Sequence, residues 1–498
     1  MLIENGAEVM KSDKDKLTPL HAVCAPSFNK ILNSIQDATL AVVYGYKSVT
    51  VNPSNLNLNV AEMLIKCGAD VNATTSEGTT PLMFACSGNE SELINMLIDK
   101  GANINMVDKK WMTALHISSI ASNYNVVNIL LAHGSIPDTE DKDGNTPLHF
   151  LCGQQLIHGN ESFTVLHSVL MHSVLEDGDN CLEAIKLLID KGANINHSNK
   201  FGHTPLYVAS MFDSLKRIKL LIENGADISK KDNSGRSVLF AAFLSENSEI
   251  LKCLVENGAN INDVDEDGIS SLLLFCGVTT KTNKTFIKKA KLSSVLQMLQ
   301  PSKTENIENS YEENLEHKIF LLVENGADVN LADRKGQTPL MGACDTQKNK
   351  IVELLIAMGA HVDDADNNGI TALMIGCFHG YYDIVNVLLE EANVNKFSKE
   401  GYVPLHYACM KGHETIVKML LQNNANVNHL NKTGWTPLMF ACKHGYRDIV
   451  KFLLEHGADA TWYSNDRWYP LKLAKNGHFK SIENLLNEYG SYMNEDDN

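Results

Sequence analysis

Apolar residues in this chain fall into pairs of short clusters separated by polar, glycine-containing turns. Residues 438–442 form an uninterrupted apolar run, and Ile449, Val450, Leu453 and Leu454 follow after a short polar turn. The second cluster has the spacing of one face of an α-helix, and the first is long enough for a short buried helix. The pattern therefore predicts two short helices joined by a turn.

The same pair of clusters recurs behind the phrase Thr-Pro-Leu. The phrase opens at Thr18, Thr80, Thr146, Thr204, Thr338 and Thr436, with degenerate copies at Thr113, Ser237, Ser270, Thr371, Val403 and Tyr469. Copies such as those at 80, 113 and 146 are 33 residues apart. A preceding glycine supplies the positive φ of a tight turn, the Thr hydroxyl caps the next helix, and proline suits its first position. We expect the proline-free copies at Ser237 and Ser270 to be the weakest caps.

The segment from Gly434 to Asp459, with its Gly-Trp-Thr-Pro-Leu opening and its Leu-Leu-Glu-His-Gly-Ala-Asp close, resembles the ankyrin repeat. About twelve copies in register, the first incomplete, extend the resemblance over nearly the whole chain. It implies an all-α ankyrin-repeat solenoid over residues 1–490, followed by an acidic tail over 491–498. It also implies stacked antiparallel helices, β-hairpin fingers that border a concave groove, and a role in binding proteins.

Three long insertions fall between the two predicted helices of the first, fourth and seventh repeats, near residues 26–58, 154–180 and 278–314. Each holds an amphipathic stretch, such as the one that begins at Phe28, and we expect three additional helices. Their recurrence every third repeat indicates duplication of a three-repeat block. One interpretation is that each additional helix covers exposed core residues of its own repeat. The other is that the three helices form a row of docking sites for a repetitive partner.

The repeat pattern departs from its register at a few places. The run from Glu390 to Asn393 lacks the closing glycine and is one residue short, so we expect a local irregularity near Glu391, and Asn424 stands in the next glycine position. Residues 2–8 match residues 221–227, the end of a repeat. We therefore expect the sequence to be a fragment or a truncated gene product, whereas the polar second helix after Lys480 suits a terminal cap.

The charge balance limits the choice of partners. The formal net charge is −17, and the densest basic run, 288–291, is short, so we expect no nucleic-acid partner. No apolar run reaches the roughly 20 residues of a membrane span, and we expect no direct membrane insertion. Residues 1–10 lack the features of a secretory signal. We expect a monomer in the cytoplasm, with the nucleus as the alternative compartment.

Cysteine and histidine recur in register, which favours a structural role. Eight of the cysteines lie six residues after the phrase opening and are interpreted as small buried packing residues: Cys24, Cys86, Cys152, Cys276, Cys344, Cys377, Cys409 and Cys442. His21, His116, His149 and His406 share a position that holds Met, Tyr, Phe or Leu in other copies, and the resemblance implies that this His hydrogen-bonds between repeats. With no catalytic motif found, we expect no enzyme, no cofactor and no metal site.

Aromatic residues before the phrase are the candidate binding residues. Tyr402, Trp435 and Trp468 fill one position in three successive repeats, and Trp111 and Phe201 lie near equivalent fingers. Exposed Trp and Tyr side chains are typical of protein-binding hot spots. The competing interpretation is that each ring packs on its neighbouring finger and stabilises the stack. The predicted function is a protein-interaction scaffold or adaptor that uses the groove and fingers; the alternative is a stoichiometric inhibitory subunit of an enzyme or transcription factor.

Overall fold

The computed structural model describes residues 11–25, 56–88, 90–153, 179–212, 214–243, 245, 247–277 and 307–489. The chain divides into two units, Met1–Ala259 (unit 1) and Asn260–Asn498 (unit 2). Within the described ranges the regular elements are helices, and the only β pairing consists of two isolated bridges, Val264 with Ser270 and Ala365 with Thr371. The all-α class is confirmed, and the fingers are tight turns without regular strands.

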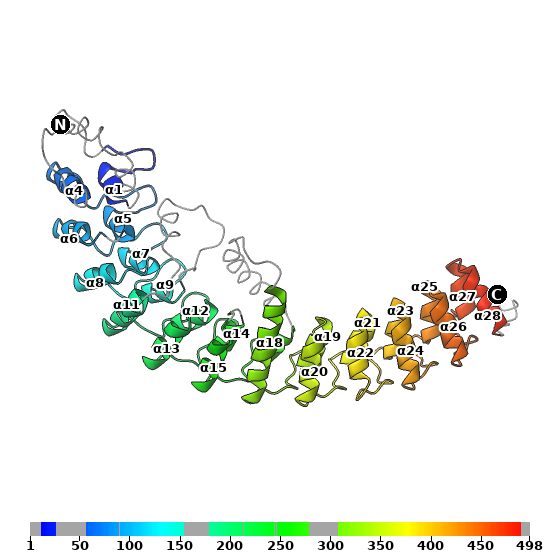
Figure 1. Ribbon diagram of the computed structural model, residues 1–498. Helices are drawn as coiled ribbons and strands as arrows, with labels where there is room; N and C mark the ends of the chain where they lie inside the picture. Colours follow the sequence, from blue (N-terminus) through cyan, green and yellow to red (C-terminus); the bar gives the residue numbers. More distant parts are fainter. Residues whose placement is uncertain are drawn as a thin grey trace. The chain divides into compact units, whose positions relative to one another are not determined.

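The helices of unit 1 form pairs, and the two helices of each pair lie in two separate rows (Figure 1). In every pair we call the helix after the Thr-Pro-Leu position the first helix and its successor the second helix. The pairs are α1 (Pro19–Cys24) with α4 (Leu56–Lys66), α5 (Pro81–Gly88) with α6 (Ser91–Asp99), α7 (Ala114–Ile120) with α8 (Tyr124–Ala132), α9 (Pro147–Cys152) with α11 (Asp179–Asp190), α12 (Pro205–Met211) with α13 (Leu215–Glu223), and α14 (Val238–Ala242) with α15 (Ser248–Glu256).

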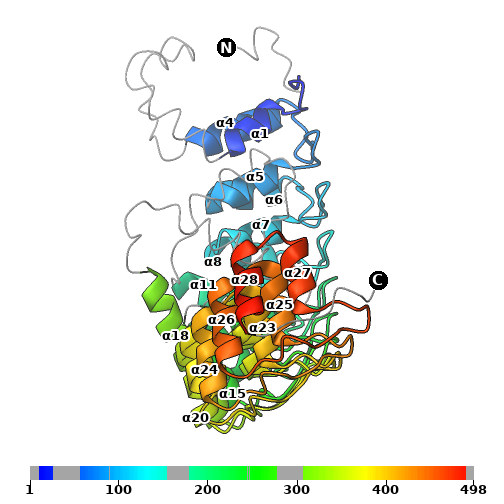
Figure 2. The same cartoon turned by 90° about the vertical axis from the view of Figure 1, so that its right-hand side faces the viewer.

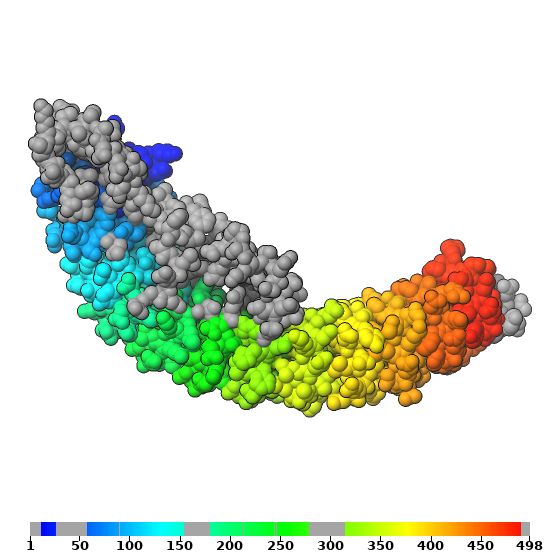
Figure 3. Space-filling model, in the orientation of Figure 1, coloured from blue at the N-terminus to red at the C-terminus, as the bar shows by residue number. Residues whose placement is uncertain are grey.

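Unit 2 repeats the same arrangement. Its pairs are α16 (Ser271–Cys276) with α18 (Ile307–Glu324), α19 (Pro339–Asp345) with α20 (Asn349–Ala357), α21 (Ala372–His379) with α22 (Tyr382–Leu388), α23 (Pro404–Lys411) with α24 (Glu414–Gln422), α25 (Pro437–His444) with α26 (Arg447–Glu455), and α27 (Pro470–Asn476) with α28 (Lys480–Glu488). Figure 2 shows the finger loops of unit 2 on the side of the first helices α23, α25 and α27. From α19 to α28 the repeats pack without a break (Figure 3).

Stacking buries the apolar columns that the sequence pattern predicts. First helices contact first helices, as α21, α23 and α25 do, and second helices contact second helices. In α23 the side chains of Leu405, Ala408 and Cys409 have no exposed area. All eight cysteines predicted to share this small slot are buried and free. Burial of one apolar layer per repeat stabilises the stack, since each pair alone leaves its apolar face in water.

The helix starts follow from the turn and cap chemistry of the phrase. Gly434 has φ of 74°, and the Thr436 hydroxyl accepts the N–H of Met439 at 3.3 Å. Proline occupies the first turn of α25. The expectation of weak caps holds at Ser237, which accepts no capping hydrogen bond, and α14 is only five residues long. It fails at Ser270, whose hydroxyl accepts the N–H of Leu273 at 3.2 Å.

The predicted irregularity near Glu391 is present. Helix α22 ends at Leu388 after seven residues, whereas α24 has nine. Asn424 takes the glycine position of the next repeat with φ of 62°, as its tolerance of this conformation allows. The stretches predicted as insertion helices lie outside the described residues. Only the ends of the three insertion ranges are described, where α4 begins at Leu56, α11 at Asp179 and α18 at Ile307.

Asparagine side chains join consecutive repeats where the second helices end. The Asn428 amide donates to the carbonyl of Gly457 at 3.0 Å, and its oxygen accepts the N–H of Asp459 at 2.8 Å. The same pair of bonds is made by Asn72, Asn105, Asn196, Asn262, Asn330 and Asn395. One bond of each pair satisfies a backbone carbonyl in the turn after the second helix, and the other satisfies a backbone N–H two residues further on. Among the described helices, none has the length and apolarity that crossing a bilayer would require.

Candidate functional site

The recurring histidines connect each first helix to the next finger. Nδ1 of His406 accepts the N–H of Val403 at 3.1 Å, so Nε2 carries the proton and donates to the carbonyl of Trp435 at 3.1 Å. His21, His116 and His149 make the equivalent bonds. Burial lowers the pKa of His116 and His406 to about 4 and that of His149 to about 3. The inter-repeat role is confirmed, and these rings are neutral at pH 7.

The buried cysteines have the chemistry of packing residues. Burial raises the pKa of the Cys276 thiol to about 12, and it raises the pKa values of Cys86 and Cys377 even further. A protonated, buried thiol is a poor nucleophile and a poor metal ligand. In the ranges that the structure describes, no three His, Cys, Asp or Glu side chains gather as a metal site would require.

The three aromatic residues predicted to share a position in unit 2 do share it. The N–H groups of Tyr402, Trp435 and Trp468 donate to the side chain four residues earlier, at 3.1, 2.8 and 2.9 Å. Their carbonyls accept the backbone N–H of that same residue. Because the turn geometry repeats, each ring leaves its finger in the same way, and all three rings are half-buried.

Two of these rings converge on one side chain of the first helix. The ring centroids of Trp435 and Tyr402 lie 4.9 and 5.9 Å from that of Phe440, a residue of α25 that is 7% exposed. Tyr402 also lies 5.6 Å from Tyr407 in α23, which lies 6.1 Å from Phe378 in α21. Rings at these separations attract one another beyond their buried area. We call these five residues, from three consecutive repeats, the aromatic stripe.

Lysine ammonium groups lie over the rings. Lys411 Nζ is 4.2 Å from the Phe378 ring centroid, and Lys443 Nζ is 5.2 Å from that of Trp435. Lys472 Nζ lies 5.0 Å from the ring centroid of Trp468 in the last repeat. All three lysines are exposed. Cation–π attraction holds each ammonium group near its ring without neutralising it, and among the described residues no carboxylate pairs with these lysines.

The two candidate residues of unit 1 occupy other finger positions. Trp111 takes the glycine position of its turn, with φ of 63°, and is 53% exposed. Phe201 lies one residue before Gly202, at the tip of its turn, and is 52% exposed. Lys200 Nζ is 5.9 Å from the Trp111 ring. Both residues are more exposed than Tyr402, Trp435 and Trp468. The Phe201 ring centroid lies 5.9 Å from that of His203, which stacks on Tyr207 at 4.5 Å.

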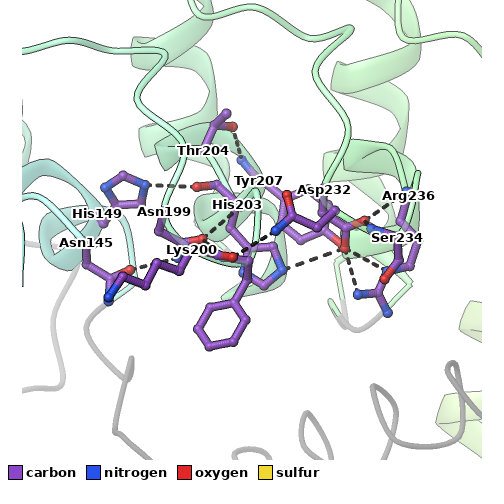
Figure 4. Close-up of polar contacts among 12 residues, drawn as sticks. Asn145, His149, Asn199, Lys200, His203, Thr204, Tyr207, Asp232, Ser234 and Arg236 are labelled. Carbon is purple, nitrogen blue, oxygen red and sulfur yellow. Dashed lines mark hydrogen bonds and ion pairs between the residues drawn. The ribbon is translucent and has the colours of Figure 1, made fainter. Parts of the chain in front are cut away.

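Unit 1 places a buried ion pair where unit 2 has aromatic rings (Figure 4). Arg236 fills the position that corresponds to Trp435, and its Nε and Nη2 lie 2.7 Å from Oδ2 of the fully buried Asp232. The Tyr207 hydroxyl donates to the same oxygen at 3.2 Å, and His203 Nε2 lies 3.7 Å away. Burial alone would raise the pKa of Asp232, but His203, Arg236 and two backbone N–H groups outweigh it and lower that pKa.

Sequence reasoning identified the finger aromatics but missed their companions on the first helices. Phe440 and Tyr407 stand in the fourth position of α25 and α23, whereas Lys411 and Lys443 stand near the ends of those helices. Comparison of the first-helix columns would have shown that unit 2 replaces the Gly342 and Ile375 of its earlier repeats with large rings. The ring and lysine contacts between neighbouring repeats leave no comparable pattern in the sequence.

Comparison with known sequences supports the repeat assignment directly. A model of the family described as ankyrin repeats, in three copies, matches residues 51–141, 88–166, 170–265, 310–398 and 405–497. A search of curated proteins gave no significant match. Ankyrin repeats generally mediate protein–protein interaction and are typically non-enzymatic modules. Since these matches extend over most of the chain, the protein belongs to the ankyrin-repeat family.

Proposed function

We propose that this protein is an interaction scaffold or adaptor that binds a partner protein on the finger and first-helix surface of unit 2. The observation that carries the proposal is the aromatic stripe, Phe378, Tyr402, Tyr407, Trp435 and Phe440, with exposed lysines over its ends. Half-buried Trp and Tyr rings are anchored by packing and still offer apolar area to a partner. Pre-organised rings also lose little conformational entropy on binding.

We further propose a monomeric protein without catalytic activity that resides in the cytoplasm. Buried, neutral histidines and protonated cysteines support a structural role for the residues that chemistry would otherwise use. The eleven free cysteines suit a reducing compartment. The net charge of −17 disfavours a nucleic-acid partner.

Affinity capture from a cytosolic lysate, with the full chain as bait, tests the binding surface. Changing Tyr402, Trp435 and Trp468 together to Ala should abolish capture of a partner while the far-UV circular dichroism spectrum is retained. The matched control is Tyr382→Ala, which removes an exposed ring from the start of the second helix α22. Equal capture by the triple variant and the wild type would refute the proposal.

The stoichiometry of the captured complex separates scaffold from inhibitor. A scaffold should bring down several partners, or one partner together with others attached to it. A single partner at a one-to-one ratio, whose own activity falls when it binds, would identify a stoichiometric inhibitory subunit instead. The three insertions are tested in the same way, because deleting them should leave capture unchanged if the aromatic stripe is the site.

A further inference from the structure

Three lysines of the last three repeats, Lys411, Lys443 and Lys472, carry charge that no described carboxylate balances. Lys411 and Lys443 are exposed, and their ammonium groups lie over the ring faces of Phe378 and Trp435. Lys472 lies over Trp468 and also donates to the carbonyl of Arg467 at 3.4 Å. A ring face and a carbonyl attract an ammonium group but leave its full positive charge in place.

Two acidic side chains near this surface, Glu400 and Asp345, are already engaged. Glu400, at the finger tip before Tyr402, lies 3.8 Å from Lys432. Asp345, at the end of α19, lies 3.1 Å from His379. On the second helices of the same repeats, Lys418 and Lys451 each pair with a glutamate one helical turn away, although Lys418 Nζ also lies 5.6 Å from the Phe452 ring centroid. Among the described residues, Lys411, Lys443 and Lys472 thus lack a carboxylate partner on the side of unit 2 that carries the rings, in a chain whose net charge is −17.

We propose that the partner presents an acidic, apolar segment in extended conformation to this surface, with its carboxylates on Lys411, Lys443 and Lys472 and its apolar side chains on the rings between them. This inference rests on the proposed function and specifies the chemistry of its partner. The charge complementarity is the argument: exposed ammonium groups beside desolvated ring faces favour a ligand that alternates carboxylates with apolar groups.

The repeat spacing sets the spacing of the carboxylates. Lys443 and Lys472 lie over rings that occupy the same finger position in adjacent repeats, Trp435 and Trp468. Packed helices of adjacent repeats are separated by about 10 Å. An extended chain covers that distance in about three residues. The segment should therefore carry an acidic residue at roughly every third position, with Leu or aromatic residues between.

A labelled peptide tests this chemistry without knowledge of the natural partner. The probe is a short fluorescein-labelled peptide with Glu at every third position and Leu and Tyr between, and its binding to the full chain is measured by fluorescence anisotropy. The Glu peptide should bind at least about tenfold more tightly than the same peptide with Gln, and its affinity should fall as salt rises. Equal binding of the two peptides would overturn the proposal.

Variants of the protein locate the binding surface. Lys443→Glu with Lys472→Glu should reduce affinity for the Glu peptide by at least about tenfold and should instead bind a peptide with Lys at every third position. The control with the same charge change is Lys219→Glu with Lys252→Glu, on the second helices α13 and α15, and it should bind as the wild type does. All four lysines are exposed, so neither double variant should change the thermal unfolding temperature by much.

Other occupants would be recognised in the same experiment. If the Glu peptide binds only after removal of residues 491–498, the chain's own acidic tail fills the surface and the proposal fails. If the protein self-associates in size-exclusion chromatography and the Lys443, Lys472 variant does not, a second copy is the occupant, and the proposal also fails. If a captured protein is lost with the aromatic residues but kept by the lysine variant, the proposed function stands and this inference is wrong.

Discussion

The Nε2–H of His406 donates to the carbonyl oxygen of Trp435, 29 residues further along the chain, at 3.1 Å. The bond connects a buried ring of the first helix α23 to the backbone of the next finger. Since Trp435 then lies 4.9 Å from Phe440 on α25, the orientation of the candidate binding residue depends on two consecutive repeats. Stability and the proposed binding surface are therefore coupled in unit 2.

His406→Met should weaken this connection while the helix itself is retained, because Met occupies the same position at Met374 and Met439. The carbonyl of Trp435 loses its side-chain donor, and we expect a loss of about 1–3 kcal/mol in the free energy of unfolding. Urea denaturation followed by tryptophan fluorescence measures it. Met439→Leu, a change of similar volume in the next repeat, should lower the free energy of unfolding by less than the His406 substitution. An equal loss would contradict a stabilising contribution of the bond from His406 to the carbonyl of Trp435.

Acidification should destabilise the protein through its buried histidines. The folded-state pKa of His116 is about 4, whereas its ordinary value is 6.5. Between these values the unfolded chain binds the proton more readily, so stability rises with pH and is lost as pH falls from 6.5 toward 4. For His116 the loss by pH 4 is about 3 kcal/mol. Urea midpoints measured from pH 7 to pH 4.5 should fall steadily.

Whether the histidines cause this pH dependence of the urea midpoint can be tested separately. His149 has a still lower pKa, about 3, and His149→Met removes its titration. The variant should show a smaller fall in urea midpoint between pH 7 and pH 4.5 than the wild type. If the urea midpoint of the variant falls as much as that of the wild type, other groups cause the acid sensitivity.

Asp232→Asn should isolate the charge of the buried network from its turn geometry. Asn199 and Asn431 occupy the same position in other fingers and accept the same backbone N–H groups, so the turn should survive. The variant removes the carboxylate that lies 2.7 Å from the guanidinium of Arg236, and we expect a loss of about 3 kcal/mol. Thermal and urea unfolding measure it.

A matched substitution and a double variant separate the ion pair from other effects. Glu183→Gln removes one partner of the exposed pair with Lys186 and should cost less than about 1 kcal/mol. Arg236→Gln introduces the residue type that Gln337 supplies at the equivalent position, and it should recover part of the stability when combined with Asp232→Asn. Additive losses in the double variant would show that the two charges do not interact.

Asn424→Gly should stabilise unit 2. Asn424 has φ of 62°, in a position where other repeats have glycine. Glycine adopts this conformation without steric cost, and we expect a gain of up to about 1 kcal/mol. Gly457→Asn is the reverse change at the equivalent position, where an added Cβ would meet nothing within 4 Å, and it should destabilise by a similar amount. The same sign for both changes in urea denaturation would contradict the backbone explanation.

Phe440→Ala and Trp435→Ala should separate the stabilising role of the aromatic stripe from its binding role. Phe440 is 7% exposed and supports two finger rings, so its truncation should cost about 3–5 kcal/mol. Trp435 is half-buried, and its truncation should cost clearly less. Denaturation curves give both values. A loss for Trp435→Ala as large as that for Phe440→Ala would favour a mainly structural role for the Trp435 ring.

The repeat, its caps and its buried columns were predictable from the sequence because they depend on local chemistry. The turn glycine at Gly434, the cap at Thr436 and the packing position of Cys442 lie within a few residues of one another, and their 33-residue period marks each copy. The departure near Glu391 was visible for the same reason, since a missing residue interrupts that period.

The tertiary structure decided which side chains meet between repeats. Tyr402 and Trp435 were predicted as neighbours of the groove, but their shared contact with Phe440 and the lysines over the rings depend on how one repeat stacks on the next. The cluster of Asp232, Arg236, Tyr207 and His203 likewise assembles side chains from two fingers and a helix. Local sequence sets the backbone of each repeat, whereas burial and charge between repeats arise only when their surfaces are brought together.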